Sequence, residues 1–352
     1  MMTHDAFGHP LLSGLFGDEE IAALLSSEAS LAHMLMVESA YAEALGKVGL
    51  VPVDIAQTAA VQIKGFVPDV TGLRTRMAAD GVVVPALVEQ LKGALSADLH
   101  IALHKGMTSQ DVVDTSLILS LSPILQVLGG RIAALLIALN DLMERFGDNA
   151  LQGRTRMQAA LPIKVGARIK TWQASLVAHQ NTLSDISPRL LVLQLGGPVG
   201  TRAGLAPNIA TEMAEILGLS DPAAAWHTNR EALVEFAGWL SLVTGSLGKI
   251  GVDATLMAQQ GVDEIALTGG GRSSAMSHKS NPILAETLVT LARYNATQLP
   301  GMHHALVHEQ ERSGSAWALE WMILPSMVMA TGSALSTATK LCGSVTRLGG
   351  AN

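Results

Sequence analysis

The stretch TSLILSLSPILQVLGG, residues 115–130, contains no charged side chain, and a further apolar run follows Arg131. It lies within the first of three long apolar segments, residues 112–146, 232–262 and 314–342. Helices that are apolar on nearly every face are buried in a core or packed against other subunits. The three segments therefore predict an all-α protein built on long helices, with a core formed by oligomerisation.

The same stretch raises a membrane alternative, because a spanning helix needs about 20 mostly apolar residues. Polar and helix-distorting residues interrupt it at Ser116, Ser120, Ser122, Pro123 and Gln126. These interruptions favour a helix buried in a bundle over one that faces lipid. We therefore expect no membrane association.

Composition excludes several other classes of protein. The 352 residues are 49% apolar and only 3% aromatic, which favours a large helical core of aliphatic side chains. The net charge of -7 and the lack of a basic run argue against a nucleic-acid partner. The single cysteine, Cys342, allows no intrachain disulfide and fits a reducing cytoplasm. Residues 1–14 do not read as a secretory signal.

The N-terminal part of the chain also reads as helical. Residues 18–45 place apolar side chains three and four positions apart, with glutamates between them, and residues 46–52 end the pattern. Strand patterns are scarce. The stretch Gly-Val-Val-Val-Pro at residues 81–85 is too short to change the fold class.

Residues 268–282 concentrate the most chemistry in the fewest positions. Small residues at 268–271 give a backbone free to move, and Ser273, Ser274, Lys279 and Asn281 follow, with Pro282 able to start a helix. A lysine and a helix N-terminus both favour negative charge, so the segment suits an anionic substrate. A solvated connector is the alternative interpretation of such a loop.

Three segments, in order, resemble the fumarase/aspartase superfamily. They are residues 104–115 (HKGMTSQDVVDT), 153–162 (GRTRMQAALP) and 273–282 (SSAMSHKSNP), the last of which departs from the usual signature at Ser277, where proline is common. Residues 194–201, 226–230, 308–313 and 317–321 are similar to the 3-carboxy-cis,cis-muconate cycloisomerase family within that superfamily. Adenylosuccinate lyases share parts of these segments.

The resemblance implies a domain organisation and an assembly. It implies an N-terminal helical domain over residues 1–100 and a central long-helix bundle over 101–342 with a catalytic lid at 268–282. A tail over 343–352 would follow, with the third domain absent or reduced. It further implies a cytoplasmic homotetramer with active sites shared between subunits, no cofactor, and a small di- or tricarboxylate as substrate.

The resemblance also implies the chemistry, which is addition and elimination through a carbanion stabilised as an aci-carboxylate. Ser273 matches the superfamily's base and would protonate carbon during lactone formation, with its alkoxide stabilised by Lys279. Thr108, Ser109 and Asn281 would donate hydrogen bonds to the substrate. His104 would orient a carboxylate or assist proton transfer.

Residues 155–158 depart from the superfamily in an informative way. Fumarases and the lyases carry Thr-His-x-Gln, whereas this chain has Thr155, Arg156, Met157 and Gln158. The histidine helps a leaving group that needs a proton. A carboxylate leaving group does not, since its pKa is about 4. We expect Thr155, Arg156 and Gln158 at the substrate, with Arg156 binding a carboxylate; a structural ion pair is the alternative.

Three further features remain open. Arg312 could bind a carboxylate from a neighbouring subunit or form an interhelical ion pair. His303, His304 and His308 could place two imidazoles on one helical face, but the segment after His308 lacks the second histidine of a His-Glu-x-x-His zinc motif, and we expect no metal. Residues 196–200 are glycine-rich but read as a turn between helices, not as a dinucleotide loop.

These motifs lead to three hypotheses about function. The first is a cycloisomerase that converts 3-carboxy-cis,cis-muconate to a carboxymuconolactone in aromatic catabolism. The second is a lyase that releases fumarate from adenylosuccinate or argininosuccinate. The third is a non-enzymatic helical scaffold.

Overall fold

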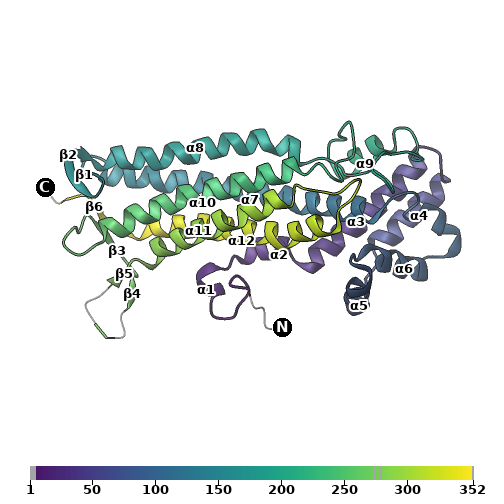
Figure 1. The fold of residues 1–352 in the computed structure, drawn as a ribbon, viewed down its shortest axis with the longest axis horizontal. Helices are drawn as coiled ribbons and strands as arrows, with labels where there is room; N and C mark the ends of the chain where they lie inside the picture. The colour runs from purple at the N-terminus through teal and green to yellow at the C-terminus, as the bar shows by residue number, and fades with distance from the viewer. Residues whose placement is uncertain (1–4, 273–274, 277–279, 351–352) are drawn as a thin grey trace.

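Long helices run side by side along the molecule (Figure 1). The computed structural model describes residues 5–272, 275–276 and 280–350. The bundle consists of α7 (Ser109–Phe146), α8 (Val165–Leu190), α10 (Glu231–Met257), α11 (Ile283–His304) and α12 (Gly314–Ser344). Three of these helices match the apolar segments identified in the sequence, and the all-α fold class is confirmed.

Shorter helices gather at one end of the bundle (Figure 1). They are α3 (Ser27–Lys47), α4 (Val53–Lys64), α5 (Val70–Asp80), α6 (Val84–Ala94), the 3-10 helix η1 (Ala97–Ala102) and α9 (Ile209–Leu217), while α1 (Ser13–Phe16) and α2 (Glu19–Leu24) lie along the bundle. The amphipathic pattern at 18–45 forms two helices, because Ser26 caps α3 by accepting from the Ala29 N–H at 3.1 Å.

The structure adds short strands that the sequence patterns did not predict. β1 (Ala150–Thr155) pairs with β2 (Gln158–Lys164), β3 (Ile265–Leu267) with β6 (Val345–Leu348), and β4 (Gly271–Arg272) with β5 (Ser280–Asn281), each pair antiparallel. Residues 81–85 form no strand, and α6 begins within them at Val84. Such short two-stranded ribbons are barely stable alone and depend on packing against the neighbouring helices. Their own sequences therefore give only a weak indication of a strand.

Two apolar cores stabilise the chain. One fills the five-helix bundle, and the other lies between α3, α4, α6, the start of α7 and α9. Ile118, Leu121, Ile124 and Leu128 of α7 are fully buried, so residues 115–130 form the buried bundle helix expected from the sequence.

Much apolar surface nevertheless remains outside these cores. The segments Glu19–Lys47, Ser109–Phe146 and Gly314–Ser344 are long and apolar enough to cross a membrane by length and composition alone. Only 33% of the most apolar window of α7 is buried within the chain, and Ile137 and Met322 are 69% and 76% exposed. Large exposed apolar faces on long helices indicate contact with another protein or with a membrane.

Candidate active site

The start of α7 carries three of the residues expected at the site: His104, Thr108 and Ser109. Thr108 is the N-cap of α7, and its N–H donates to the Asp111 carboxylate at 3.0 Å. Ser109 is the first residue of the helix. The sequence thus places two hydroxyl-bearing residues at a helix N-terminus, where an anion is favoured.

Asp111 organises the backbone around this helix start. Its buried carboxylate accepts from the N–H groups of Gly196 and Gly197, at 2.7 and 3.0 Å, and contacts His227 Nε2 at 2.8 Å. The carboxylate therefore holds the loop at 196–200 against Thr108 and Ser109. The structure confirms the turn that the sequence predicts at 196–200. The role of Asp111 was not predicted. Its position three residues after a threonine cap is the sequence pattern that indicates a capping carboxylate.

His104 lies beside this group, in a left-handed backbone conformation with φ of 50°. Its Nδ1 lies 2.6 Å from the Oε1 of Glu38, a buried carboxylate of α3. Burial alone would lower the pKa of His104, but the hydrogen bond and charge of Glu38, with a contribution from Asp111, outweigh it and raise the pKa.

Arg312 reaches the same end of the bundle from the segment before α12. Its Nε donates to Gln110 Oε1 at 2.9 Å, and its Nη2 donates to the Pro198 carbonyl at 3.1 Å. Within the described residues no carboxylate pairs with Arg312, which argues against the interhelical ion pair considered from the sequence. Its guanidinium lies instead beside Gln110, in the first turn of α7.

The tryptophan-rich segment 317–321 has a structural role. The guanidinium of Arg230 is fully buried and pairs with Asp114 at 2.6 Å and Glu320 at 2.5 Å, while the Trp317 indole N–H donates to Asp114 at 2.9 Å. Buried charges require such pairing, because an unpaired one is strongly destabilising. This network connects α7, the start of α10, and α12.

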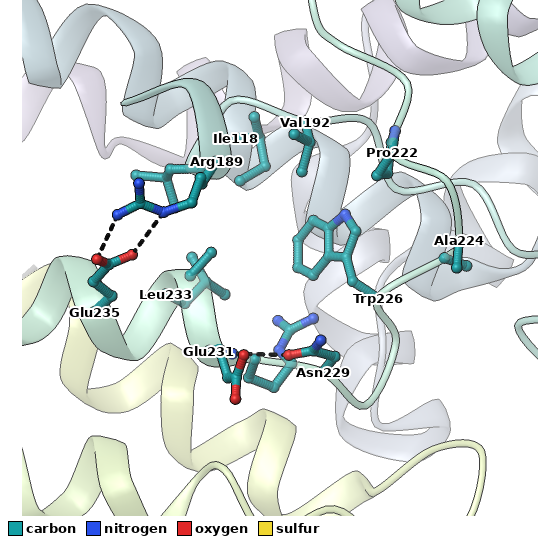
Figure 2. A pocket seen from close by; sticks show the side chains of 14 residues that line it. Ile118, Arg189, Val192, Pro222, Ala224, Trp226, Asn229, Glu231, Leu233 and Glu235 are labelled. Atoms are coloured by element: carbon teal, nitrogen blue, oxygen red, sulfur yellow. Dashed lines mark hydrogen bonds and ion pairs between the residues drawn. The ribbon is translucent and has the colours of Figure 1, made fainter. Parts of the chain in front are cut away.

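A cavity of about 400 Å³ opens beyond Arg230, between the end of α8 and the start of α10 (Figure 2). Figure 2 shows Trp226 on one side and the Arg189–Glu235 ion pair on the other. None of the residues predicted for the site lines this cavity. We therefore do not assign it to the candidate active site.

Thr155, Arg156 and Gln158 lie at the opposite end of the molecule, on the β1–β2 hairpin (Figure 1). Thr155 pairs with Gln158, so Arg156 and Met157 form a two-residue turn, with φ of 50° and 67°. Two successive positive φ values are typical of the tight hairpin turn that matches strand twist. The turn presents Arg156 to solvent.

The predicted lid is described only in part. β4 and β5 close its base, with Gly271 opposite Asn281, and α11 begins one residue after Pro282. Asn281 is half-buried in β5. The two residues predicted to carry the proton chemistry, Ser273 and Lys279, lie outside the described residues.

The length of α7 separates the two groups of site residues. Its 38 residues, at a rise of 1.5 Å each, span about 57 Å. Thr108 immediately precedes this helix and Arg156 lies on the hairpin that follows it. A single chain therefore does not bring His104, Thr108, Ser109 and Arg312 together with Thr155, Arg156 and Gln158.

The histidines considered as metal ligands do not converge. His303 and His304 end α11, and His308 lies in the following segment. Among the residues that the structure describes, no group of three or more His, Cys, Asp or Glu side chains could hold a metal ion. Burial and the nearby Arg230 lower the pKa of His308.

The long-helix bundle, with hydroxyl-bearing residues at a helix N-terminus and a short hairpin at the far end, defines an all-α enzyme of the fumarate lyase type. A solved fumarate lyase from Mesorhizobium sp. BNC1 superposes with a TM-score of 0.88 at 29% identity, covering 95% of this chain and 76% of that one. The family model described as Lyase matches residues 16–296. The chain belongs to this family.

Within this family, the chain is similar to particular enzymes of known name. The chain is 35% identical over 350 residues to the 3-carboxy-cis,cis-muconate cycloisomerase of Pseudomonas aeruginosa, covering 96% of this chain and 75% of the relative. The solved 3-carboxy-cis,cis-muconate lactonizing enzyme of Pseudomonas putida superposes with a TM-score of 0.88 at 33% identity, covering 96% of this chain and 77% of that one.

Proposed function

We propose that this chain is a cycloisomerase that converts 3-carboxy-cis,cis-muconate to a carboxymuconolactone in aromatic catabolism. The proposal is supported by relatives of that name across 96% of the chain. The observation that carries it is Arg156 at the tip of the β1–β2 turn. An arginine cannot serve as a general acid near neutral pH, so the position suits a reaction whose leaving group is already stable as an anion.

The reaction is an internal rearrangement that needs no oxidant or cofactor. One carboxylate oxygen of the substrate bonds to a carbon of the diene, and the negative charge moves onto the neighbouring carboxylate as an aci-carboxylate. Ser273 then delivers a proton to the carbon beside that carboxylate, which completes the lactone. Lys279 stabilises the serine alkoxide that remains until it is reprotonated.

The helix start supplies groups for the developing charge. Thr108 and Ser109 donate hydrogen bonds to the aci-carboxylate. Asn281 of β5, which lies at the hairpin end of the bundle, joins them from another chain. His104 and Arg312 hold a second carboxylate at the end of the bundle where α7 begins. Preorganised donors of this kind stabilise charge that develops during the reaction. Thr155 and Gln158 flank Arg156, which binds a substrate carboxylate from the hairpin.

The complete site is assembled from several copies of the chain. The two groups of residues lie about 57 Å apart along α7, and the long helices expose apolar faces. A homotetramer with parallel and antiparallel helices would cover those faces and bring one chain's hairpin to another chain's α7. The apolar faces are better covered by other copies of the chain than by lipid, because α7 carries the buried carboxylates Asp111 and Asp114 in its first turns, and ionisable residues are costly inside a membrane.

The test is direct. The purified protein is mixed with 3-carboxy-cis,cis-muconate, and the loss of diene absorbance is followed for wild type and Ser273→Ala. We expect rapid loss with wild type and a rate about 100- to 10,000-fold lower with the variant, because general acid catalysis contributes that much. No loss with wild type, together with cleavage of adenylosuccinate or argininosuccinate, would identify a fumarate-releasing lyase instead.

A further inference from the structure

A second cavity, of about 630 Å³, lies beside the turn end of the β1–β2 hairpin. The hairpin, the first turn of α8 and the last turns of α10 form its walls. Its lining combines basic and apolar side chains: Arg154, Arg156, Met157, Arg168, Lys249, Val252, Asp253, Leu256, Met257, Gln259, Val262 and Glu264. The cavity thus adjoins the residue that we assign to a substrate carboxylate.

The charges of this cavity do not balance. Four cations face two carboxylates. Arg154 pairs with Glu264 at 2.6 Å, and Lys249 pairs with Asp253. Across the described part of the chain, no carboxylate pairs with Arg156 or Arg168. The cavity therefore presents two guanidinium groups without a counter-charge, and a binding anion would provide it.

Both arginines stand on ordered backbone. Arg168 is the fourth residue of α8 and is half-buried, and Arg156 is fixed by the tight turn of the hairpin. The N-terminus of α8 adds a partial positive charge to the same region. Guanidinium groups held on rigid elements lose little freedom on binding a planar carboxylate, so they select for its geometry as well as its charge.

The remaining wall suits the carbon skeleton of an unsaturated acid. Val252 and Leu256 project from one face of α10, and Met257 lies beside them. An apolar wall next to two cations fits a molecule with a flat hydrocarbon chain and an ionised end. It suits a strongly hydrated inorganic anion less well.

We propose that Arg156 and Arg168 form an anion subsite for the third carboxylate of the substrate, and that Arg168 determines the preference for tricarboxylates over dicarboxylates. This inference rests on the proposed function, since it assigns one part of that substrate to this cavity. Arg168 lies outside the motifs that resemble the superfamily, so its sequence position does not predict this role.

Binding of unreactive probes tests the subsite without relying on turnover. Propane-1,2,3-tricarboxylate and glutarate are titrated calorimetrically into wild type, Arg156→Met, Arg168→Met and Arg168→Lys. We expect wild type to prefer the tricarboxylate, and each methionine variant to bind it about 10- to 100-fold more weakly, which corresponds to the loss of a charged hydrogen-bonded contact. The affinity for glutarate should change little. The affinity of Arg168→Lys for the tricarboxylate should lie between those of wild type and Arg168→Met, because lysine keeps the charge but cannot form two parallel hydrogen bonds to a carboxylate.

A matched control comes from the same helix. Lys170→Met also removes one positive charge from α8, but Lys170 is exposed and lines a different cavity. It should keep the wild-type preference. Thermal unfolding of every variant verifies that it is folded.

The outcomes separate the two proposals. If Arg168→Met keeps the full preference for the tricarboxylate, or wild type shows none, the subsite is wrong whatever the enzyme's activity. If the preference depends on both arginines while 3-carboxy-cis,cis-muconate is not cyclised, the subsite stands and the proposed reaction fails.

Discussion

At the residue scale, charged groups act in pairs whose geometry sets their role. Asp111 receives two backbone N–H groups from the loop at 196–200 and holds it against the start of α7. Arg230 is neutralised by Asp114 and Glu320. Arg156, Arg168 and Arg312, by contrast, have no carboxylate partner among the described residues, and we assign substrate contacts to these three arginines.

The role of Arg156 can be measured directly. Arg156→Ala should raise the Michaelis constant for the substrate by about tenfold or more, because a charged hydrogen bond to carboxylate is lost. Steady-state kinetics provides the measurement. Unchanged Michaelis constant and unchanged turnover would show that this arginine does not touch substrate.

The His104–Glu38 pair predicts a dependence of stability on pH. The folded-state pKa of His104 is raised, so the stabilisation is fully present below the unfolded pKa of about 6.5 and is lost as the pH rises through the folded pKa. Urea unfolding of wild type and Glu38→Gln at pH 6 and pH 8.5 measures it. Glu38→Gln should lower the free energy of unfolding more at pH 6 than at pH 8.5. An equal loss at both pH values would contradict a stabilising pair between Glu38 and protonated His104.

At the element scale, the close approach of α10 and α11 depends on glycine. A Cβ on Gly251 would lie 2.5 Å from the Ala285 carbonyl oxygen and 3.0 Å from Leu288 Cβ. Such overlap forces the helices apart. The axial position of α11 therefore depends on the absence of a single methyl group.

Gly251→Ala should destabilise the protein by about 1–3 kcal/mol, the usual cost of overpacking. Gly245→Ala is its control on the same helix, because a Cβ there meets nothing within 4 Å. That variant should gain up to about 1 kcal/mol from helix propensity. Thermal unfolding of the two variants decides the matter; equal effects of the same sign would refute the packing argument.

At the scale of the whole molecule, the residues that we propose for the site lie at two opposite ends of the bundle. His104 and Arg156 lie on either side of α7, whose 38 residues span about 57 Å. An active site that uses both must take them from different chains.

Mixed assemblies would reveal that sharing. His104→Gln and Arg156→Met should each be poorly active alone, whereas co-expression should restore activity, with about one site in four carrying both native residues at random mixing. Diene loss by the purified mixture is the readout. A mixture no more active than the two variants alone would show that no active site combines His104 of one chain with Arg156 of another.

The sequence by itself determined the fold class and the family. Apolar runs at 112–146, 232–262 and 314–342 are strong signals because long buried helices need continuous apolar faces, and three of the bundle helices follow them. The ordered motifs also predict the chemistry, because hydroxyl, ammonium and guanidinium groups follow from residue type alone; that chemistry stays a prediction.

Only the tertiary structure decided which of those groups meet. Asp111 anchors the loop at 196–200, and Arg168 lines a cavity together with Val252 and Leu256 of α10; both contacts join residues far apart in the chain. The residues proposed for the site are also separated by the length of the bundle. The tight turn at Arg156 also escaped prediction, since its left-handed residues are not glycine or asparagine. Such contacts depend on how helices pack, and local sequence patterns carry no direct record of that packing.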